Sequence, residues 1–319
     1  MRRRDALHCL WAVPWATWLS ACSRRDTGGD LVDASAILEV TPTGFLVVVT
    51  SARTSLVTIE IEVDGAVIRS LQLALEPGSN VGVADIDELV PDTSYTVVID
   101  GSRTHAVRTA PADGSTRPVR LAVSADYDPS PDFANGVIDA VIASEPELYI
   151  SIGDFPYTDN GPVAVSVEDY RRRHLDTRAA APVRALHEAM GVRAIYDDHE
   201  VRNNWDAAFP AAEPERYAAA IQVWDEFFPV RSVEPDVRYR RWRWGANVEC
   251  FLLDCRRFRS ANAAPDDGSK TMLGAQQLAW FLAAIASSTA TFKLIFSSVP
   301  LAYGTGNDSW PSFARERQR

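Results

Sequence analysis

Residues 196–205, Tyr-Asp-Asp-His-Glu-Val-Arg-Asn-Asn-Trp, decide how the whole chain is interpreted. The segment contains three carboxylates, one imidazole and two amides, and it directly follows the apolar run 192–196. The apolar run predicts a buried strand, and a polar loop of this composition behind a strand is typical of a metal or phosphoester site. An acidic, solvated loop with a helix-capping aspartate is the alternative, and one such loop does not decide between the two.

Two earlier segments have the same architecture, a β-rich apolar run that ends in aspartate. Residues 119–124 lead to Asp126 and Asp128, and residues 148–152 lead to Asp154. Ligands gather at the carboxyl ends of parallel strands, so we expect the three acidic loops to converge at one edge of a sheet. Such loops would repel one another unless a cation lies among them, and oxygen ligands with one imidazole suit hard cations.

The periodicity predicts two domains joined by a linker at residues 111–118. Residues 35–110 contain short β-branched or aromatic runs between turn signals, which predicts an all-β, fibronectin-like sandwich. From residue 119 to 319, strand and helix patterns alternate, which predicts an α/β domain that begins with a βαβ unit of parallel strands. The predicted strands are 45–50, 57–63, 67–73, 95–99, 119–124, 148–152, 192–196, 238–244, 248–254 and 292–297. Apolar stripes at helical spacing, which we assign to the core, start at Phe133, Val183, Tyr217 and Leu278.

The first 21 residues have the features of an export signal. Three arginines precede an apolar stretch at residues 10–19, which is too short, and too broken by Pro14, to span a bilayer. Leu-Ser-Ala-Cys at residues 19–22 resembles a bacterial lipobox, which implies cleavage before Cys22 and a lipid on its sulfur, with residues 22–34 as a tether. We therefore expect an exported periplasmic or cell-surface lipoprotein. An ordinary signal peptide is the alternative, and the twin-arginine and general secretory routes both stay open.

Charge and cysteine content narrow the possible partners. The formal net charge is −11, and loss of residues 1–21, with three arginines and one aspartate, makes it −13. A protein this acidic has no general attraction for nucleic acid or anionic membranes, so membrane contact is expected only through the lipid. Cys250 and Cys255 lie at an odd offset in a strand-like run, which places them on opposite faces and makes a disulfide between them unexpected.

Residues 197–205 resemble the signature of the PhoD-type alkaline phosphatases, a family within the calcineurin-like metallophosphatase superfamily. The resemblance covers the chain from about residue 35 to residue 319, and the order and spacing of its short tracts make it specific. The similar tracts are residues 89–95, 108–111, 153–157, 169–172, 227–231, 253–260, 273–277 and 297–301.

The resemblance implies a hydrolase of phosphate mono- or diesters with a metallophosphatase α/β sandwich, expected to be a monomer that acts on a small phosphoester. It implies a site that holds iron with calcium, with other divalent metals as alternatives. Asp154 would bridge the metals, Tyr157 would bind iron as phenolate, and Asp198 would bind the second metal. His199 would lie beside the leaving group while a metal-bound hydroxide attacks phosphorus.

The resemblance leaves the roles of the asparagines and arginines open. We favour Asn204 over Asn203 as a further metal ligand. Arg256, and with it Arg259, could clamp the phosphate, with pairing to Asp254 at the surface as the alternative for these arginines. The remaining histidines of the folded part are interpreted as structural; they are His105, His174 and His187.

The chain departs from the family pattern at two places. Ala125 stands where the family usually has a cysteine iron ligand, and Asp126 or Asp128 could substitute for it. The later Gly-Asp-x-His segment of the family is absent, so the catalytic domain is expected to be incomplete. The alternative functions are therefore an inactive surface lipoprotein that binds phosphate or a polyanion, and a fragment that does not fold stably.

Overall fold

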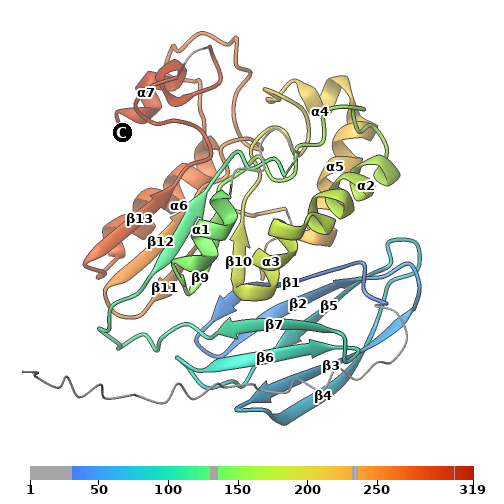
Figure 1. The fold of residues 1–319 in the computed structure, drawn as a ribbon. Coiled ribbons are helices and arrows are strands. Elements are labelled where there is room, and N and C mark those ends of the chain that lie inside the picture. Colours follow the sequence, from blue (N-terminus) through green and yellow to red (C-terminus); the bar gives the residue numbers. More distant parts are fainter. Residues whose placement is uncertain (1–30, 130–135, 232–233, 235, 305) are drawn as a thin grey trace, which may run out of the picture.

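The structure is a computed structural model that describes residues 31–129, 136–231, 234, 236–304 and 306–319 (Figure 1). The expected signal peptide, the lipid site at Cys22, most of the tether and Phe133 lie outside the described residues. None of the helices in the described part of the chain has both the length and the apolar character needed to cross a bilayer.

The amino-terminal part consists of antiparallel strands in two sheets that share one core. One group of strands has the order β5-β2-β1 and the other has the order β4-β3-β6-β7. Their bounds are β1 Ala34–Thr41, β2 Gly44–Thr50, β3 Leu56–Val63, β4 Ala66–Ala74, β5 Val81–Ile86, β6 Ser94–Ile99 and β7 Arg103–Arg108. Alternate residues of β3, β6 and β7 are buried, and Ile37, Val47, Ile59 and Val97 from the two sheets lie in one hydrophobic cluster. The four strands expected before residue 110 are present, and β1, β5 and β7 are additional.

The sheet of β1 continues into the α/β part of the chain. β1 pairs in parallel with β10, Gly191–Ala194, with Leu38 opposite Val192. The resulting six-stranded order is β5-β2-β1-β10-β9-β8, where β8 is Leu121–Ser124 and β9 is Leu148–Ser151. β8, β9 and β10 are parallel neighbours, so the expected βαβ arrangement is present. The sheet therefore passes through the boundary that the sequence suggested between two domains.

A second, three-stranded sheet faces β8, β9 and β10. It has the order β11-β12-β13, and Trp244, Cys250 and Leu252 from it share a core with Leu148 and Ile150 of β9. Helices α1, α2, α3 and α5 cover the other face of the six-stranded sheet, and α6 packs beside the second sheet (Figure 1). The bounds are α1 Val137–Ala143, α2 Val167–Ala179, α3 Ala181–Ala189, α4 Phe209–Ala212, α5 Pro214–Phe227, β11 Arg240–Trp244, β12 Val248–Leu252, α6 Gly274–Ser287, β13 Phe292–Phe296, the 3-10 helix Trp310–Phe313 and α7 Ala314–Arg317.

A local sequence signal explains where α2 begins. Ser166 caps α2, because its hydroxyl accepts from the backbone N–H of Asp169 while the Asp169 carboxylate accepts from the backbone of Ser166. Cys250 and Cys255 are both free and buried, so the expectation that they form no disulfide is confirmed.

A buried ion-pair network joins β1 to β10 in the same sheet and to β11 in the second sheet. Glu39 of β1 accepts from Arg193 of β10 at 2.7 Å and from Arg240 of β11 at 2.6 and 3.1 Å. Glu39 and Arg193 are each about 5% exposed. Burial alone would raise the pKa of Glu39, but the two arginines outweigh it and the pKa is lowered.

We expect Glu39→Gln to lower the free energy of unfolding by about 3–5 kcal/mol, because it leaves two buried guanidinium groups without a carboxylate. Urea denaturation at pH 7 measures the change. Glu76→Gln is the matched control, since Glu76 is exposed and a surface change of this kind stays within about 0.5 kcal/mol. A loss no larger than that of the control would contradict a structural role for the network.

Three buried histidines have the structural role expected of them. The ring of His105 forms hydrogen bonds to Ser35 Oγ and to the backbone oxygen of His187, both at 2.8 Å. Burial lowers the pKa of His105 to about 4, and burial also lowers the pKa of His174 and of His187 well below the ordinary value. All three are therefore neutral in the folded protein at pH 7.

The lowered pKa of His105 predicts loss of stability in mild acid. The stabilising contribution is fully present above the unfolded pKa of about 6.5 and falls as the pH drops toward 4, by about 1.4 kcal/mol per pH unit. Urea denaturation at pH 7 and pH 5 measures the loss, and His105→Gln should remove this part of it. The comparison with the variant is needed to isolate His105, because His174, His187 and Asp198 also contribute to the pH dependence. An identical pH dependence in both proteins would contradict the assignment.

Candidate active site

Three acidic loops follow the carboxyl ends of neighbouring parallel strands. Asp126 follows β8, Asp154 follows β9, and Asp198 with His199 follows β10. Gly153 lets the loops approach closely: its φ is 123°, and a Cβ atom there would lie 2.5 Å from the Cβ atom of Asp197. The loops thus meet at one edge of the six-stranded sheet, as the sequence predicted.

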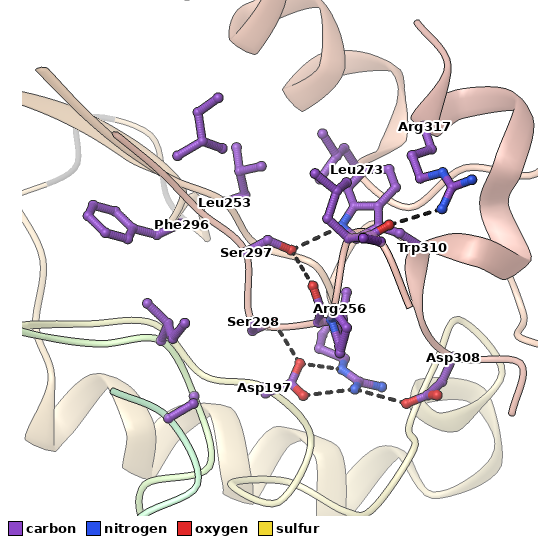
Figure 2. A pocket seen from close by; sticks show the side chains of 18 of the residues that line it. Asp197, Leu253, Arg256, Leu273, Phe296, Ser297, Ser298, Asp308, Trp310 and Arg317 are labelled. Carbon is purple, nitrogen blue, oxygen red and sulfur yellow. Dashed lines mark hydrogen bonds and ion pairs between the residues drawn. The ribbon is translucent and has the colours of Figure 1, made fainter. Parts of the chain in front are cut away.

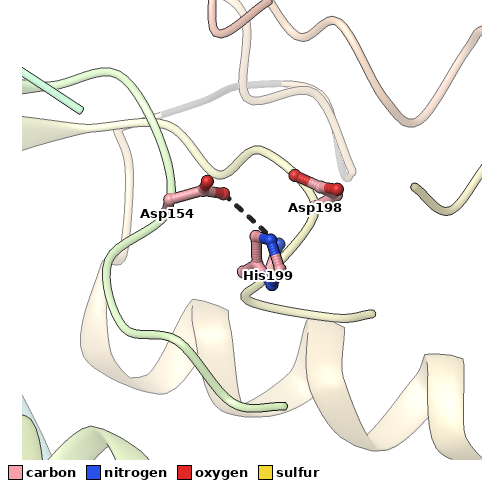
Figure 3. A group of neighbouring side chains, drawn as sticks. All are labelled: Asp154, Asp198 and His199. Carbon is pink, nitrogen blue, oxygen red and sulfur yellow. Dashed lines mark hydrogen bonds between the residues drawn. The ribbon is translucent and has the colours of Figure 1, made fainter. Parts of the chain in front are cut away.

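The side chains at this edge form a compact cluster (Figure 3). Candidate ligand atoms of Asp154, Asp198 and His199 all lie within 4.8 Å of one another. The Tyr157 hydroxyl contacts Asp154 Oδ2 and Asp126 Oδ1, each at 3.2 Å, so it links the first loop to the cluster. Four of the five residues predicted as metal ligands are therefore brought together, and their metal-binding roles stay predictions.

The pKa values show an excess of buried negative charge. Burial, then the neighbouring carboxylates Asp197 and Asp198, raise the pKa of Asp154 to about 8. Burial also raises the pKa of Asp198 to about 6, although Arg256 opposes the shift. Burial, with Asp154 and Asp126, raises the pKa of Tyr157 above its ordinary value. Carboxylates this close together remain ionised at neutral pH only if a cation compensates them, so the donor set fits a bound metal ion.

The imidazole of His199 is held by Asp159, a contact that the sequence analysis did not identify. Asp159 Oδ1 lies 2.6 Å from His199 Nδ1, and Asp159 Oδ2 accepts from the backbone N–H of Asn203 at 2.8 Å. Burial alone would lower the pKa of His199, but Asp159, Asp198 and Asp154 outweigh it and the pKa rises to about 9. In the sequence, only the position of Asp159 two residues after Tyr157 placed it near the predicted site.

Glu200 links the loop after β9 to the loop after β10 through hydrogen bonds. It is 1% exposed, and its two carboxylate oxygens accept from the backbone N–H groups of Phe155 at 2.8 Å and Asp197 at 2.9 Å. Burial, followed by the charge of Asp154, raises the pKa of Glu200 well above its ordinary value. Glu200 therefore fixes the distance between the loops that carry Asp154 and Asp198.

The amide residues contact the cluster mainly through their backbone. The backbone N–H of Asn204 donates to Asp198 Oδ2 at 2.5 Å, and its φ of 57° places it in the left-handed region. The Asn204 residue is exposed, and its expected role as a metal ligand stays a prediction. Asp128, the alternative to Asp126, accepts from Asn160 at 3.1 Å.

Arg256 is buried and bound by carboxylates at the edge of the cluster. Its Nε and Nη2 atoms lie 2.7 and 2.9 Å from the two oxygens of Asp197, and Nη2 lies 3.3 Å from Asp308 Oδ2. The alternative of a surface pair with Asp254 is wrong, because Arg256 is 1% exposed and contacts Asp254 through its backbone N–H, which donates to Asp254 Oδ1 at 3.0 Å. Its predicted contact with phosphate stays a prediction. Arg259 is also 1% exposed, so surface pairing is wrong for it as well.

A pocket of about 800 Å³ opens beside the cluster. Its lining includes Asp154, Asp198, Arg256 and Ser298 at one side. Side chains of α6, β13 and the following loop complete the wall, and Figure 2 shows Arg256, Asp197 and Asp308 in contact next to Ser298. The pocket volume lies within the range of small-molecule sites, about 300–1,000 Å³.

The fold and the site define a class of protein: two facing sheets with outer helices, and a cation-type acidic cluster at the carboxyl ends of parallel strands. Comparison with protein families narrows this class. The PhoD-like phosphatase family matches residues 134–319, which is more than half of the chain, and the chain belongs to this family.

Two known proteins are similar to this chain. Alkaline phosphatase D of Bacillus subtilis (strain 168) is 30% identical over an alignment of 204 residues, and the match covers 54% of this chain and 35% of the relative. The chain thus spans about a third of the length of that curated relative. A solved structure described as the structure of PhoD matches with a TM-score of 0.81 at 21% identity, covering 92% of this chain and 69% of the other. At that identity, the structural match establishes the shared fold.

Proposed function

We propose that this protein hydrolyses phosphate mono- or diesters with the help of bound metal ions. The observation that carries the proposal is the cluster of Asp154, Asp198 and His199, whose candidate ligand atoms lie within 4.8 Å of one another. Membership of the PhoD-like phosphatase family supports the same chemistry, as does the similarity to an alkaline phosphatase D. We also propose that the amino-terminal sandwich is fibronectin-like, in keeping with the packing of β5, β2 and β1 of the six-stranded sheet against the four-stranded sheet.

The donor atoms at the site suit a hard cation. Asp126, Asp154, Asp198 and Tyr157 supply oxygen atoms, and Ala125 stands where the family usually has a cysteine. Iron and calcium are our candidate metals, with other divalent ions as alternatives, because carboxylate and phenolate ligands favour such ions over soft ones. When bound, the ions would supply Lewis acidity and positive charge at the phosphate.

We assign metal binding, proton donation and phosphate binding to different side chains. Asp126, Asp154, Tyr157, Asp198 and Asn204 would hold the ions. His199, with Nδ1 fixed by Asp159, would present Nε2 to the leaving oxygen and supply a proton there. Arg256 lines the pocket and would contact the phosphate while it stays paired with Asp197.

The cellular context completes the proposal. We propose an exported, lipid-anchored protein at the periplasmic or outer cell surface, with Cys22 as the lipid site and a small phosphoester as the substrate. We also propose that it is a monomer. The alternative is an inactive lipoprotein that binds phosphate or a polyanion.

Metal removal and return test the proposal directly. We expect purified protein treated with a chelator to lose hydrolysis of p-nitrophenyl phosphate and bis-p-nitrophenyl phosphate, and to recover it when Fe³⁺ and Ca²⁺, or another divalent ion, are returned. Elemental analysis of the protein as purified gives the natural metal content. Phosphate binding without turnover at any metal or pH would support the inactive alternative. Hydrolysis that survives complete metal removal would contradict the proposal.

A further inference from the structure

Asp197 joins the two facing sheets at the acidic edge of the site. It follows β10, and its two carboxylate oxygens accept from Nε and Nη2 of Arg256, which follows β12, at 2.7 and 2.9 Å. Ser298, which follows β13, donates its hydroxyl to Asp197 Oδ1 at 2.7 Å (Figure 2). Two parallel bonds between a carboxylate and a guanidinium fix the plane of the guanidinium as well as its position.

The guanidinium of Arg256 also lies close to Asp198, a proposed metal ligand. Its Nη2 atom is 3.4 Å from Asp198 Oδ1, which is longer than a charge-assisted hydrogen bond of about 2.7–2.9 Å. The other oxygen of Asp198 accepts from the backbone N–H of Asn204 at 2.5 Å. A shift of about 0.5 Å would therefore bond Arg256 to the oxygen that Asn204 leaves free, and the guanidinium would compete with a metal ion for it.

Burial makes this competition strong. Arg256 is 1% exposed, and a buried guanidinium that loses its carboxylate is costly unless it pairs with another one. Two further carboxylates lie near Nη2, Asp308 at 3.3 Å and Asp198 at 3.4 Å. The side chain of Asp308 is 22% exposed and that of Asp198 is 6% exposed, so solvent weakens the attraction to Asp308 more. Without Asp197, we therefore expect Arg256 to move onto Asp198.

We propose that Asp197 is a positioning residue that holds Arg256 away from Asp198, and that Ser298 keeps Asp197 in place. Asp198 then stays available to a metal ion although a buried cation lies beside it. This inference rests on the metal-assisted function proposed above, and it assigns a role in that function to a residue outside the proposed set of metal ligands.

Calcium titration of chelator-treated protein tests the inference without relying on hydrolysis. We expect Asp197→Asn to weaken Ca²⁺ binding, measured by calorimetry, by about 10- to 100-fold, the usual cost of losing a residue that supports a metal ligand. The asparagine side chain has a single acceptor oxygen, so it cannot hold both nitrogens of the guanidinium. Unchanged Ca²⁺ affinity would overturn the inference.

A double-mutant cycle separates the effect of Arg256 from the effect of the Asp197 charge. Arg256→Met removes the competing cation, so adding Asp197→Asn to this variant should change Ca²⁺ affinity by about threefold or less. An equal loss of affinity in both backgrounds would show that Asp197 attracts the ion directly, and it would overturn the inference.

Ser298→Ala loosens the same restraint without a change of charge. Loss of its hydrogen bond to Asp197 should weaken Ca²⁺ binding by about two- to tenfold. This variant decides the inference if Asp197→Asn does not fold, and an unchanged affinity would then overturn it.

Glu147→Gln is the matched control for a general loss of stability. It also takes a carboxylate from an arginine, Arg117, but it lies at the amino end of β9, at the opposite edge of the sheet from the acidic loops. Its Ca²⁺ affinity should equal that of the unmodified protein. A loss as large as that of Asp197→Asn would attribute both losses to the fold and overturn the inference.

The titration also separates this inference from the proposed function. If the unmodified protein binds Ca²⁺ but hydrolyses no phosphoester with any metal, the proposed function fails, and the variants still decide the role of Asp197. If the unmodified protein binds no Ca²⁺, the inference is overturned.

Discussion

Asp154→Asn is expected to lower kcat for p-nitrophenyl phosphate by about 10³-fold or more, equivalent to about 4 kcal/mol of transition-state stabilisation. Asp154 lies between the other acidic loops: it accepts from the backbone N–H of His199 at 3.3 Å and contacts the Tyr157 hydroxyl at 3.2 Å. The substitution keeps the size of the side chain and removes its charge. Because Asp154 is a proposed metal ligand, its loss should also lower the metal content measured by elemental analysis.

A second measurement distinguishes a ligand from a structural residue. Burial and neighbouring carboxylates raise the pKa of Asp154 to about 8, so its charge is unfavourable in the metal-free protein. The melting temperature of metal-free Asp154→Asn should therefore be no lower than that of the unmodified protein. Asp113→Asn in the exposed linker is the control and should change neither activity nor metal content. Full activity in Asp154→Asn would refute the ligand assignment.

His199→Gln is expected to lower kcat by about 10²- to 10⁴-fold, the usual contribution of a general acid. The loss should be larger for phenyl phosphate than for p-nitrophenyl phosphate, because the poorer leaving group depends more on protonation. Equal losses for the two esters would show that His199 does not protonate the leaving oxygen.

Asp159→Asn tests how much activity depends on the orientation of the His199 imidazole, as distinct from its presence. Asp159 contacts the imidazole at 2.6 Å and touches the proposed substrate only through it, so we expect a smaller loss of about 10- to 100-fold in kcat with little change in KM. Asp159 also raises the pKa of His199, so the alkaline limb of activity, where His199 loses its proton, should shift to lower pH in the variant. A higher KM with unchanged kcat would instead indicate that Asp159 only maintains the structure of the loop.

The convergence of the acidic loops could be predicted from sequence because each signal is local. An apolar run that ends in aspartate identifies Asp126, Asp154 and Asp198 one at a time, and parallel strand order then places them at the same edge. The cap at Ser166 was equally accessible, since its partner Asp169 is three residues away.

Contacts between distant segments could not be predicted in the same way. β1 was not predicted as a strand because it contains the charged Glu39, whose burial depends on arginines 154 and 201 residues later. The burial of Arg256 likewise depends on Asp197, 59 residues earlier. Asp159 lacks a distinctive neighbour, so only the folded loop connects it to His199.

The pairing of β1 with β10 has a consequence for how the protein can be divided. Removing the sandwich would expose the backbone edge of β10 and leave Arg193 without its carboxylate, directly beneath the loop that carries Asp198. The α/β part produced alone would therefore be prone to aggregate through that edge. The sandwich and the acidic cluster are best understood as products of a single folding event, because β1 completes the sheet whose parallel strands carry the acidic loops.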